Sequence, residues 1–384
     1  MTSTDHAISL LVPDLPDADA LLPWLRRIDA ARWYTNGGPL LNELESLLQR
    51  QWPSLPTPAS AALAVVALNN GTCALELAIM AMALEKGASV LMPSFTFPAT
   101  ASATLRSGLK PVFADVSPDR WQLEPDAARA IAARQPIALV MPVATFGAPV
   151  DVAAWDAFVA DTGIPVLVDA AGAFGQQAVG ERAHFVFSLH ATKPFGIGEG
   201  GLFATRDGAL AAQVRRLANF GFDNGQVVAI GGNGKLSEYA AAVALAQWRR
   251  WPDVQAARRA QWQHYLPLLR ALPGTSLQRG FSAQADVLDD TVALPANVVL
   301  HLPSAAAPMR KALAAAGIGS RAWYCPPLHR QPVFAGCALA SATLANTDAL
   351  ATQALGVPWH TRLAAADMSR VATVLRYVLD SDPA

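Results

Sequence analysis

Short apolar segments alternate with segments of helical length over roughly the first 210 residues of this chain. Each apolar segment is a continuous run, which is typical of a strand that is buried on both faces. Buried strands separated by helices form a mostly parallel sheet with helices on both sides. We therefore predict an α/β fold with seven strands, at residues 63–68, 90–93, 111–116, 137–143, 165–170, 184–190 and 200–205.

The alternation of strands and helices stops after residue 208. Two helical stretches follow, at about 211–218 and 236–270, and we expect Trp251-Pro252 to break the second. The remainder predicts a smaller α+β unit with a strand at 296–302 and helices at 305–316 and 365–379. We therefore divide the chain near residue 250, into a large α/β domain with an N-terminal arm (1–250) and a small C-terminal α+β domain (251–384).

The composition excludes several classes of protein. Hydrophobic residues make up 52% of the 384 residues and charged residues 15%, so the chain can form a large core and is not a disordered protein. The net charge of -1, without a basic run, argues against nucleic-acid binding. Three cysteines without a CxxC pair indicate a reducing compartment. No signal peptide and no apolar run of about 18–20 residues is seen, so we expect a cytoplasmic protein.

Candidate functional residues follow the first two strands, at the end where sheets of this kind bind ligands. Gly71 and Thr72 come after strand 63–68 and open a helix, where free backbone amides can cradle a phosphate. Phe97 follows strand 90–93 and offers a ring that can stack on a flat ligand. Taken singly, these features are better explained as a capped turn and a core aromatic residue.

Charged and polar residues also follow later strands. Asp169 ends an apolar strand, where a carboxylate is costly unless it is a cap or a functional anion. Lys193 lies in an uncharged, glycine-rich segment, either as a surface lysine or as an amine made nucleophilic by desolvation. Ser188, just before this segment, can add a hydroxyl donor.

Together these residues are the parts needed to hold pyridoxal 5′-phosphate (PLP). The cofactor requires a lysine for its covalent link, a carboxylate at the pyridine nitrogen, a stacking ring and a phosphate cradle. The chain has no Walker A motif, no GxGxxG after the first strand, no HExxH and no GxSxG. It also has no Cys/His cluster, so we expect no metal site.

Seven segments resemble, in order, the DegT/DnrJ/StrS family of PLP-dependent sugar aminotransferases. They are WYTNGGPLLNELE (33–45), NNGTCALELA (69–78), PSFTFPATASATLRSGLKPVFADV (93–116), VDAAGAFG (168–175), FSLHATKPFGIGEGG (187–201), GGNGKLSEYAAAVALAQW (231–248) and GIGSRAWYCPPLHRQPVF (317–334). The resemblance implies PLP-dependent transferase fold type I, which is aspartate aminotransferase-like, with PLP as the cofactor. It also implies a homodimer.

The resemblance assigns a role to each candidate residue. Lys193 would form the Schiff base, Asp169 would pair with the pyridine nitrogen, and Phe97 would stack on the ring. The phosphate would be bound by the backbone amides of Gly71 and Thr72 and by the hydroxyl of Ser188.

Two further residues are assigned by the resemblance, and other positions depart from the family pattern. Asn233 would reach the phosphate in the neighbouring subunit, so that two chains would share each site. His329 would lie near the amino donor or the sugar, unless it is an ordinary loop histidine. Gly172 stands where the family usually has Gln or His, and Gly232 and Lys235 stand where it often has Tyr and Arg. The ammonium group of Lys235 cannot form the bidentate hydrogen bonds that an arginine guanidinium forms.

The resemblance implies an aminotransferase that takes its amino group from L-glutamate. The segments TNGGPL (35–40), HATKPF (190–195) and WYCPPLH (323–329) look most like enzymes that aminate dTDP-linked 4-keto-6-deoxyhexoses. The alternatives are a 3-keto sugar or a cyclitol ketone as acceptor. A related dehydratase branch has His at the position of Lys193 and is disfavoured. A non-catalytic regulatory protein that retains PLP is the remaining alternative.

Overall fold

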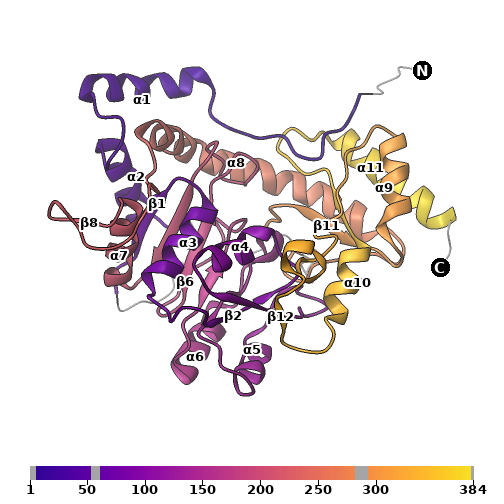
Figure 1. The fold of residues 1–384 in the computed structure, drawn as a ribbon. Coiled ribbons are helices and arrows are strands. Elements are labelled where there is room, and N and C mark those ends of the chain that lie inside the picture. Colours follow the sequence, from indigo (N-terminus) through magenta and orange to yellow (C-terminus); the bar gives the residue numbers. More distant parts are fainter. Residues whose placement is uncertain (1–5, 53–60, 282–292, 382–384) are drawn as a thin grey trace.

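The computed structural model describes residues 6–52, 61–281 and 293–381. Its central strands are β1 (Ala64–Leu68), β2 (Ser89–Pro93), β3 (Lys110–Ala114), β4 (Leu139–Val140), β5 (Leu167–Asp169), β6 (His184–Ser188), β7 (Gly201–Thr205) and β12 (Ala338–Leu339). Two four-stranded halves, β12-β3-β2-β4 and β5-β6-β7-β1, are joined by residue pairs between the β4 and β5 segments. Neighbouring strands run parallel, except that β7 is antiparallel to both β6 and β1. The prediction of a seven-stranded, mostly parallel sheet is confirmed, with β12 as an added edge strand (Figure 1).

The β4 strand is much shorter than the predicted run 137–143. Pro142 lies inside that run and has no N–H to give to a neighbouring strand. The segment nevertheless stays in the sheet, because the amides of Ala138 and Met141 donate to carbonyls of Ser89 and Leu91 on either side of the regular strand.

Helices cover both faces of the sheet. Alternate residues of one strand contribute to opposite cores, as Val65 and Val66 of β1 do. One core also contains buried residues of α2 (Pro39–Arg50), α5 (Pro125–Ala132), α6 (Val152–Thr162) and α8 (Glu238–Arg270). The other contains residues of α3 (Gly71–Ala81), α4 (Pro98–Arg106) and α7 (Gly208–Ala218). Burial on both faces explains why the strands read as continuous apolar runs.

The long helix α8 links the large domain to the C-terminal unit. It continues through Pro252, so the break expected at Trp251-Pro252 is wrong. The proline removes one helical hydrogen bond, but Trp251 and Val254 are buried in the large-domain core on either side of it. From Trp262 onward the buried residues of α8 belong to the core of the C-terminal unit instead. The boundary predicted near residue 250 therefore lies inside this helix.

In the described residues, the C-terminal unit combines a small sheet with three α-helices that follow α8. Its antiparallel strands are β10 (Ser276–Leu277), β11 (Val298–His301) and β13 (Ala354–Val357). Its helices are α9 (Ala306–Ala315), α10 (Ala345–Gln353) and α11 (Ala365–Ser381). The N-terminal arm runs from this unit to α1 (Ala18–Ala31) (Figure 1). The Ile8 amide donates to the carbonyl of Gly317 (2.9 Å), and the Gly319 amide donates to the carbonyl of Ile8 (2.8 Å), which fixes the arm to the unit.

Candidate active site

Asp169 and Lys193 lie at the same end of two neighbouring strands. Asp169 is the last residue of β5, and Lys193 lies in the loop after β6, the parallel neighbour of β5. The Asp169 side chain is buried and accepts hydrogen bonds from the hydroxyl of Thr100 (2.7 Å) and the amide of Ala171 (3.2 Å). Lys193 is partly buried.

Burial shifts the pKa values of these two groups toward each other. Desolvation raises the pKa of Asp169, against the hydrogen bonds from Thr100 and Ala171 and the charge of Lys193. Desolvation also lowers the pKa of Lys193, against the charge of Asp169. A buried carboxylate with a raised pKa is suited to receive a cationic ring nitrogen, and an amine with a lowered pKa is suited to covalent chemistry. Asp169 therefore fits the pyridine nitrogen of PLP, and Lys193 fits the covalent link to the cofactor.

The phosphate cradle predicted at Gly71 and Thr72 is the first turn of α3. Asn70 caps this helix by accepting from the amide of Cys73 (2.8 Å), and no described residue accepts from the amides of Gly71 and Thr72. A Cβ on Gly71 would lie 3.1 Å from the Cβ of Ser188, so glycine permits the close approach of the end of β6. Two free amides and a nearby hydroxyl at a helix N-terminus form an anion site. These residues fit a phosphate group.

Phe97 and Asn233 are both exposed. Phe97 precedes α4 and is 59% exposed, which leaves its ring open to a ligand or a second chain. The turn that holds Asn233 lies against Asn69 of the same chain: the Asn69 side chain donates to the Asn233 carbonyl (3.2 Å), and the Asn69 amide donates to Gly234 (2.9 Å). The turn is thus closer to its own cradle than its place in the sequence suggests, while the Asn233 side chain remains exposed.

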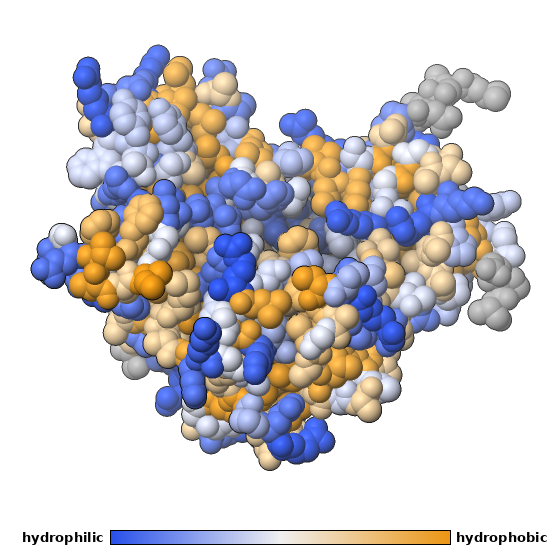
Figure 2. All heavy atoms as spheres, viewed as in Figure 1, coloured by the Kyte–Doolittle hydropathy of each residue, from blue (hydrophilic) through white to orange (hydrophobic). Residues whose placement is uncertain are grey.

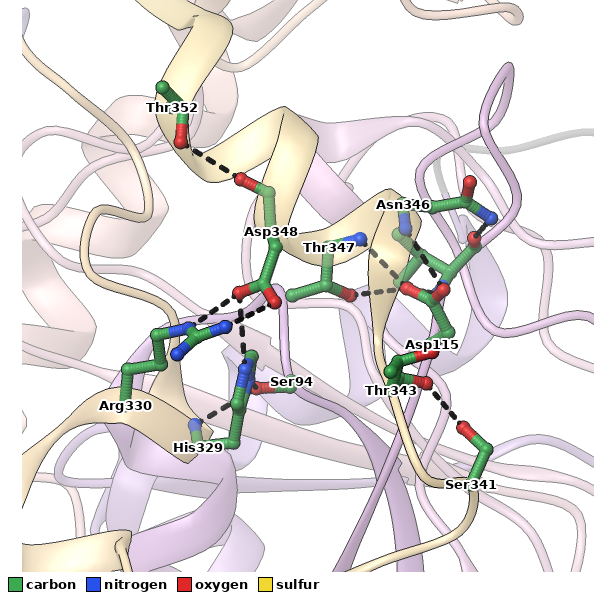
Figure 3. A network of polar contacts seen from close by, with 11 residues as sticks. Ser94, Asp115, His329, Arg330, Ser341, Thr343, Asn346, Thr347, Asp348 and Thr352 are labelled. Carbon is green, nitrogen blue, oxygen red and sulfur yellow. Dashed lines mark hydrogen bonds and ion pairs between the residues drawn. The ribbon is translucent and has the colours of Figure 1, made fainter.

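His329 lies in a polar network between the large domain and α10 (Figure 3). Its Nδ1 is 2.7 Å from Oγ of Ser94, and its Nε2 is 3.2 Å from a carboxylate oxygen of Asp348. Arg330 holds Asp348 through two further hydrogen bonds. The order Ser-His-Asp resembles a hydrolase triad, but Ser94 is completely buried and no substrate can reach it. Both ring nitrogens of His329 have protein partners, so this residue ties the 328–330 turn to the end of β2.

Thr100 and Tyr324 are site residues that the sequence analysis did not select. Thr100 lies in the first turn of α4, three residues after Phe97, and binds the Asp169 carboxylate. The Tyr324 ring stacks on Phe146 with centroids 5.3 Å apart and meets Phe95 edge-on at 5.4 Å. Burial raises the pKa of Tyr324, and the charge of Asp169 raises it further. Both residues lie in segments that carry the family resemblance, which is the signal that could have found them.

The packing around Gly172 explains its departure from the family pattern. A Cβ at this position would lie 3.1 Å from the Cβ of Ala296 and 3.3 Å from the amide nitrogen of Gly147. Gly147 ends the short turn η1 (Thr145–Gly147), and the amide of Ala296 donates to the carbonyl of Phe146 in that turn (2.8 Å). In this chain the turn and the residues just before β11 occupy the space that a larger side chain at residue 172 would need.

Lys235 is also engaged within its own chain. Its ammonium donates to the side chain of Asn219 (2.9 Å) and lies 4.7 Å from the centroid of the Phe220 ring.

Among the described residues there is no cluster of three or more His, Cys, Asp or Glu side chains that could hold a metal ion. None of the helices formed by the described residues is both long and apolar enough to cross a membrane.

Residues 19–376 match the model of the DegT/DnrJ/EryC1/StrS aminotransferase family. The chain is 28% identical to the dTDP-4-amino-4,6-dideoxy-D-glucose transaminase of Escherichia coli, over 94% of this chain and 95% of that protein. It is 29% identical to the UDP-2-acetamido-2-deoxy-3-oxo-D-glucuronate aminotransferase of Pseudomonas aeruginosa, over 80% and 84%.

A solved structure extends the similarity to three dimensions. The crystal structure of DesI in the presence of its TDP-sugar product superposes with a TM-score of 0.82 and 32% identity. The match covers 97% of this chain and 92% of DesI.

Proposed function

Since the chain belongs to the DegT/DnrJ/EryC1/StrS aminotransferase family, we propose that it aminates a nucleotide-linked keto sugar with L-glutamate as donor. It is a PLP-dependent aminotransferase of fold type I. We propose a dTDP-4-keto-6-deoxyhexose as the sugar. The observation that supports an aminotransferase most directly is the placement of Lys193 and Asp169 at the same end of neighbouring strands, where the charge of each acts on the other. We place this activity in the cytoplasm, where the three free thiols of the chain would persist.

In this proposal each residue near the cofactor has a defined task. Bound PLP supplies an electron sink and a carbonyl carbon that carries the amino group between substrates. Lys193 would hold the cofactor covalently at rest, and its free amine, once released, would accept the proton from the Cα of the amino donor. Asp169 keeps the ring nitrogen protonated, and Thr100 orients the Asp169 carboxylate. The first turn of α3 and Ser188 bind the phosphate.

Two relatives support different acceptors. The E. coli relative and DesI are described with a dTDP- or TDP-linked sugar, which supports the 4-keto-6-deoxyhexose. The P. aeruginosa relative acts by its name on a 3-oxo sugar, which makes a 3-keto acceptor the second candidate. A cyclitol ketone is the third.

A panel of keto-sugar nucleotides distinguishes these acceptors. The purified holoenzyme is incubated with L-glutamate and each ketone in turn, and the products are identified by mass spectrometry. We expect the amino sugar only from the dTDP-linked 4-keto sugar. Glutamate alone should also change the absorbance of the bound cofactor, and no change would favour the non-catalytic, regulatory alternative.

We further propose that the enzyme is a homodimer with shared active sites. Exposed apolar side chains gather around the hairpin of β8 (Phe222–Asp223) and β9 (Gln226–Val227), where Figure 2 shows a hydrophobic area. They include Phe220, Val228 and Ile230, the last of them 89% exposed. Asn233 is exposed three residues further along the chain. A second copy that covers this area would bury apolar surface and bring Asn233 to the partner's phosphate cradle.

A further inference from the structure

A small cavity lies next to the segment that contains Lys193. Its walls include Gly175, Pro194 and Leu294, together with one face of α8. The space open to the centre of a water-sized sphere is ≈ 20 Å³. This is room for one water molecule or one ion of similar size.

Three hydrogen-bond donors line this cavity from one helix. Trp251, Gln255 and Arg258 follow one another at intervals of four and three residues, so they share a face of α8. The Trp251 side chain is 5% exposed, and its indole N–H has no hydrogen-bond acceptor among the described residues. An orphaned buried donor of this kind indicates a missing acceptor.

The Gly175 backbone packs closely against two of these side chains. Its φ of +90° is in the region that favours glycine. A Cβ on Gly175 would lie 2.5 Å from Cζ2 of Trp251 and 3.5 Å from the side-chain nitrogen of Gln255. The indole ring and the Gln255 amide therefore both lie next to the Gly175 backbone, and a side chain at residue 175 would clash with the ring.

Arg258 adds an uncompensated positive charge to this donor set. It is 7% exposed, donates to the carbonyl of Pro295 (2.5 Å) and lies 5.1 Å from the centroid of the Trp359 ring. No described carboxylate forms an ion pair with it, and Asp14, which acts on it only through its charge, is bound to Arg250 (2.8 Å). Burial lowers the pKa of Arg258 to about 10, so the guanidinium is still charged at neutral pH.

We propose that this cavity binds one small monovalent anion of the size of chloride, held by Arg258, the Trp251 indole N–H and the Gln255 amide. A water molecule would satisfy the N–H groups but would leave the buried charge without a counter-ion, which is costly. Phosphate or sulfate is too large for the space. The bound anion would join α8 to the loop of Lys193 and Pro194, and so would couple anion binding to the stability of that loop.

Bromide tests the proposal, because it substitutes for chloride and can be located by anomalous scattering. In crystals of the holoenzyme grown with sodium bromide, we expect an anomalous peak within hydrogen-bond distance of the Trp251 indole nitrogen and of Arg258. In solution, the melting temperature should rise by roughly 1–3 °C when gluconate is replaced by chloride at equal ionic strength.

Variants separate this site from general salt effects. Arg258→Met should lower the bromide affinity about tenfold or more and abolish the chloride-dependent shift. Trp251→Phe keeps most of the packing and removes only the N–H, so it should weaken bromide binding even if Arg258→Met fails to fold. Arg249→Met is the matched control, because Arg249 is an exposed arginine on the same helix that lies over Trp24 and is outside the cavity. A cavity without a bromide peak, or equal melting temperatures in the two salts, would overturn the proposal.

Discussion

Lys193 is the residue on which the proposed chemistry depends most directly. Borohydride reduction of the holoenzyme followed by peptide mapping should place the pyridoxyl group on Lys193, because burial lowers the pKa of its amine. Lys193→Ala should still retain PLP after dialysis through the cradle at Gly71 and Thr72, yet transfer no amino group. Lys235→Ala is the matched control and should remain labelled at residue 193. Recovery of the label on Lys235 would contradict the assignment.

Asp169→Asn tests whether the buried carboxylate acts on the cofactor or only caps a strand. The substitution keeps the shape of the side chain and removes the charge that would hold the ring nitrogen protonated. A charge-assisted hydrogen bond contributes about 1.5–3 kcal/mol, so kcat/KM should fall by about one to two orders of magnitude with little change in melting temperature. An activity within a few-fold of the unsubstituted enzyme would identify Asp169 as a structural cap.

Thr100 is a positioning residue whose effect should appear in the pH profile. Its hydroxyl donates to Asp169 and lowers the pKa of that carboxyl. The proposed mechanism requires Asp169 to be ionised, so activity should be lost as the pH falls through the pKa of this carboxyl. Thr100→Val removes the hydrogen bond, raises that pKa and should move the acid limb of kcat/KM to higher pH. Thr100→Ser should restore the limb, whereas equal loss of activity at every pH would indicate a purely structural role.

At the scale of elements, the strands were predictable, but the continuity of α8 through Pro252 was not. The seven strands read as apolar runs because both faces of the sheet are covered. The edge strand β12 has two residues and pairs with β3 more than 200 residues away, so no local pattern marks it. The proline at residue 252 predicted a break in α8, but the helix continues because the tertiary packing of Trp251 outweighs one lost hydrogen bond.

Within the candidate site, too, residues that a local sequence pattern marks were predictable, whereas residues placed by long-range contacts were not. Asp169 and Lys193 stood out because charged residues are rare in apolar or uncharged segments. Thr100 and Tyr324 are residue types that occur anywhere in a core, and their contacts with the Asp169 region join segments far apart in the chain. The contact of the His329 Nε2 atom with Asp348 likewise depends on α10, and no sequence pattern predicts that α10 lies near β2.

Gly172→Gln tests whether the turn η1 and the residues just before β11 occupy the space of the family's larger side chain. Because a Cβ there would lie 3.1 Å from Ala296, the substitution should destabilise the fold by about 1–3 kcal/mol rather than improve catalysis. Gly208→Gln, at a position with nothing within 4 Å of the added Cβ, is the control. Ala296→Gly should recover part of the loss, and a neutral Gly172→Gln would show that this packing is loose.

At the scale of the whole molecule, the shared-site dimer can be tested by mixing two variants. Asn233→Ala should weaken PLP retention, and Lys193→Ala should abolish turnover. In an isologous dimer, a mixed pair has one site with Lys193 from one chain and Asn233 from the other, so random mixing should restore about a quarter of the sites. The exposed hairpin at β8 and β9 would supply apolar surface for such a pair. Separate tags on the two chains verify that mixed dimers form. Mixed dimers without recovery, or an active monomer by light scattering, would contradict the shared site and leave Asn233 a residue of its own subunit.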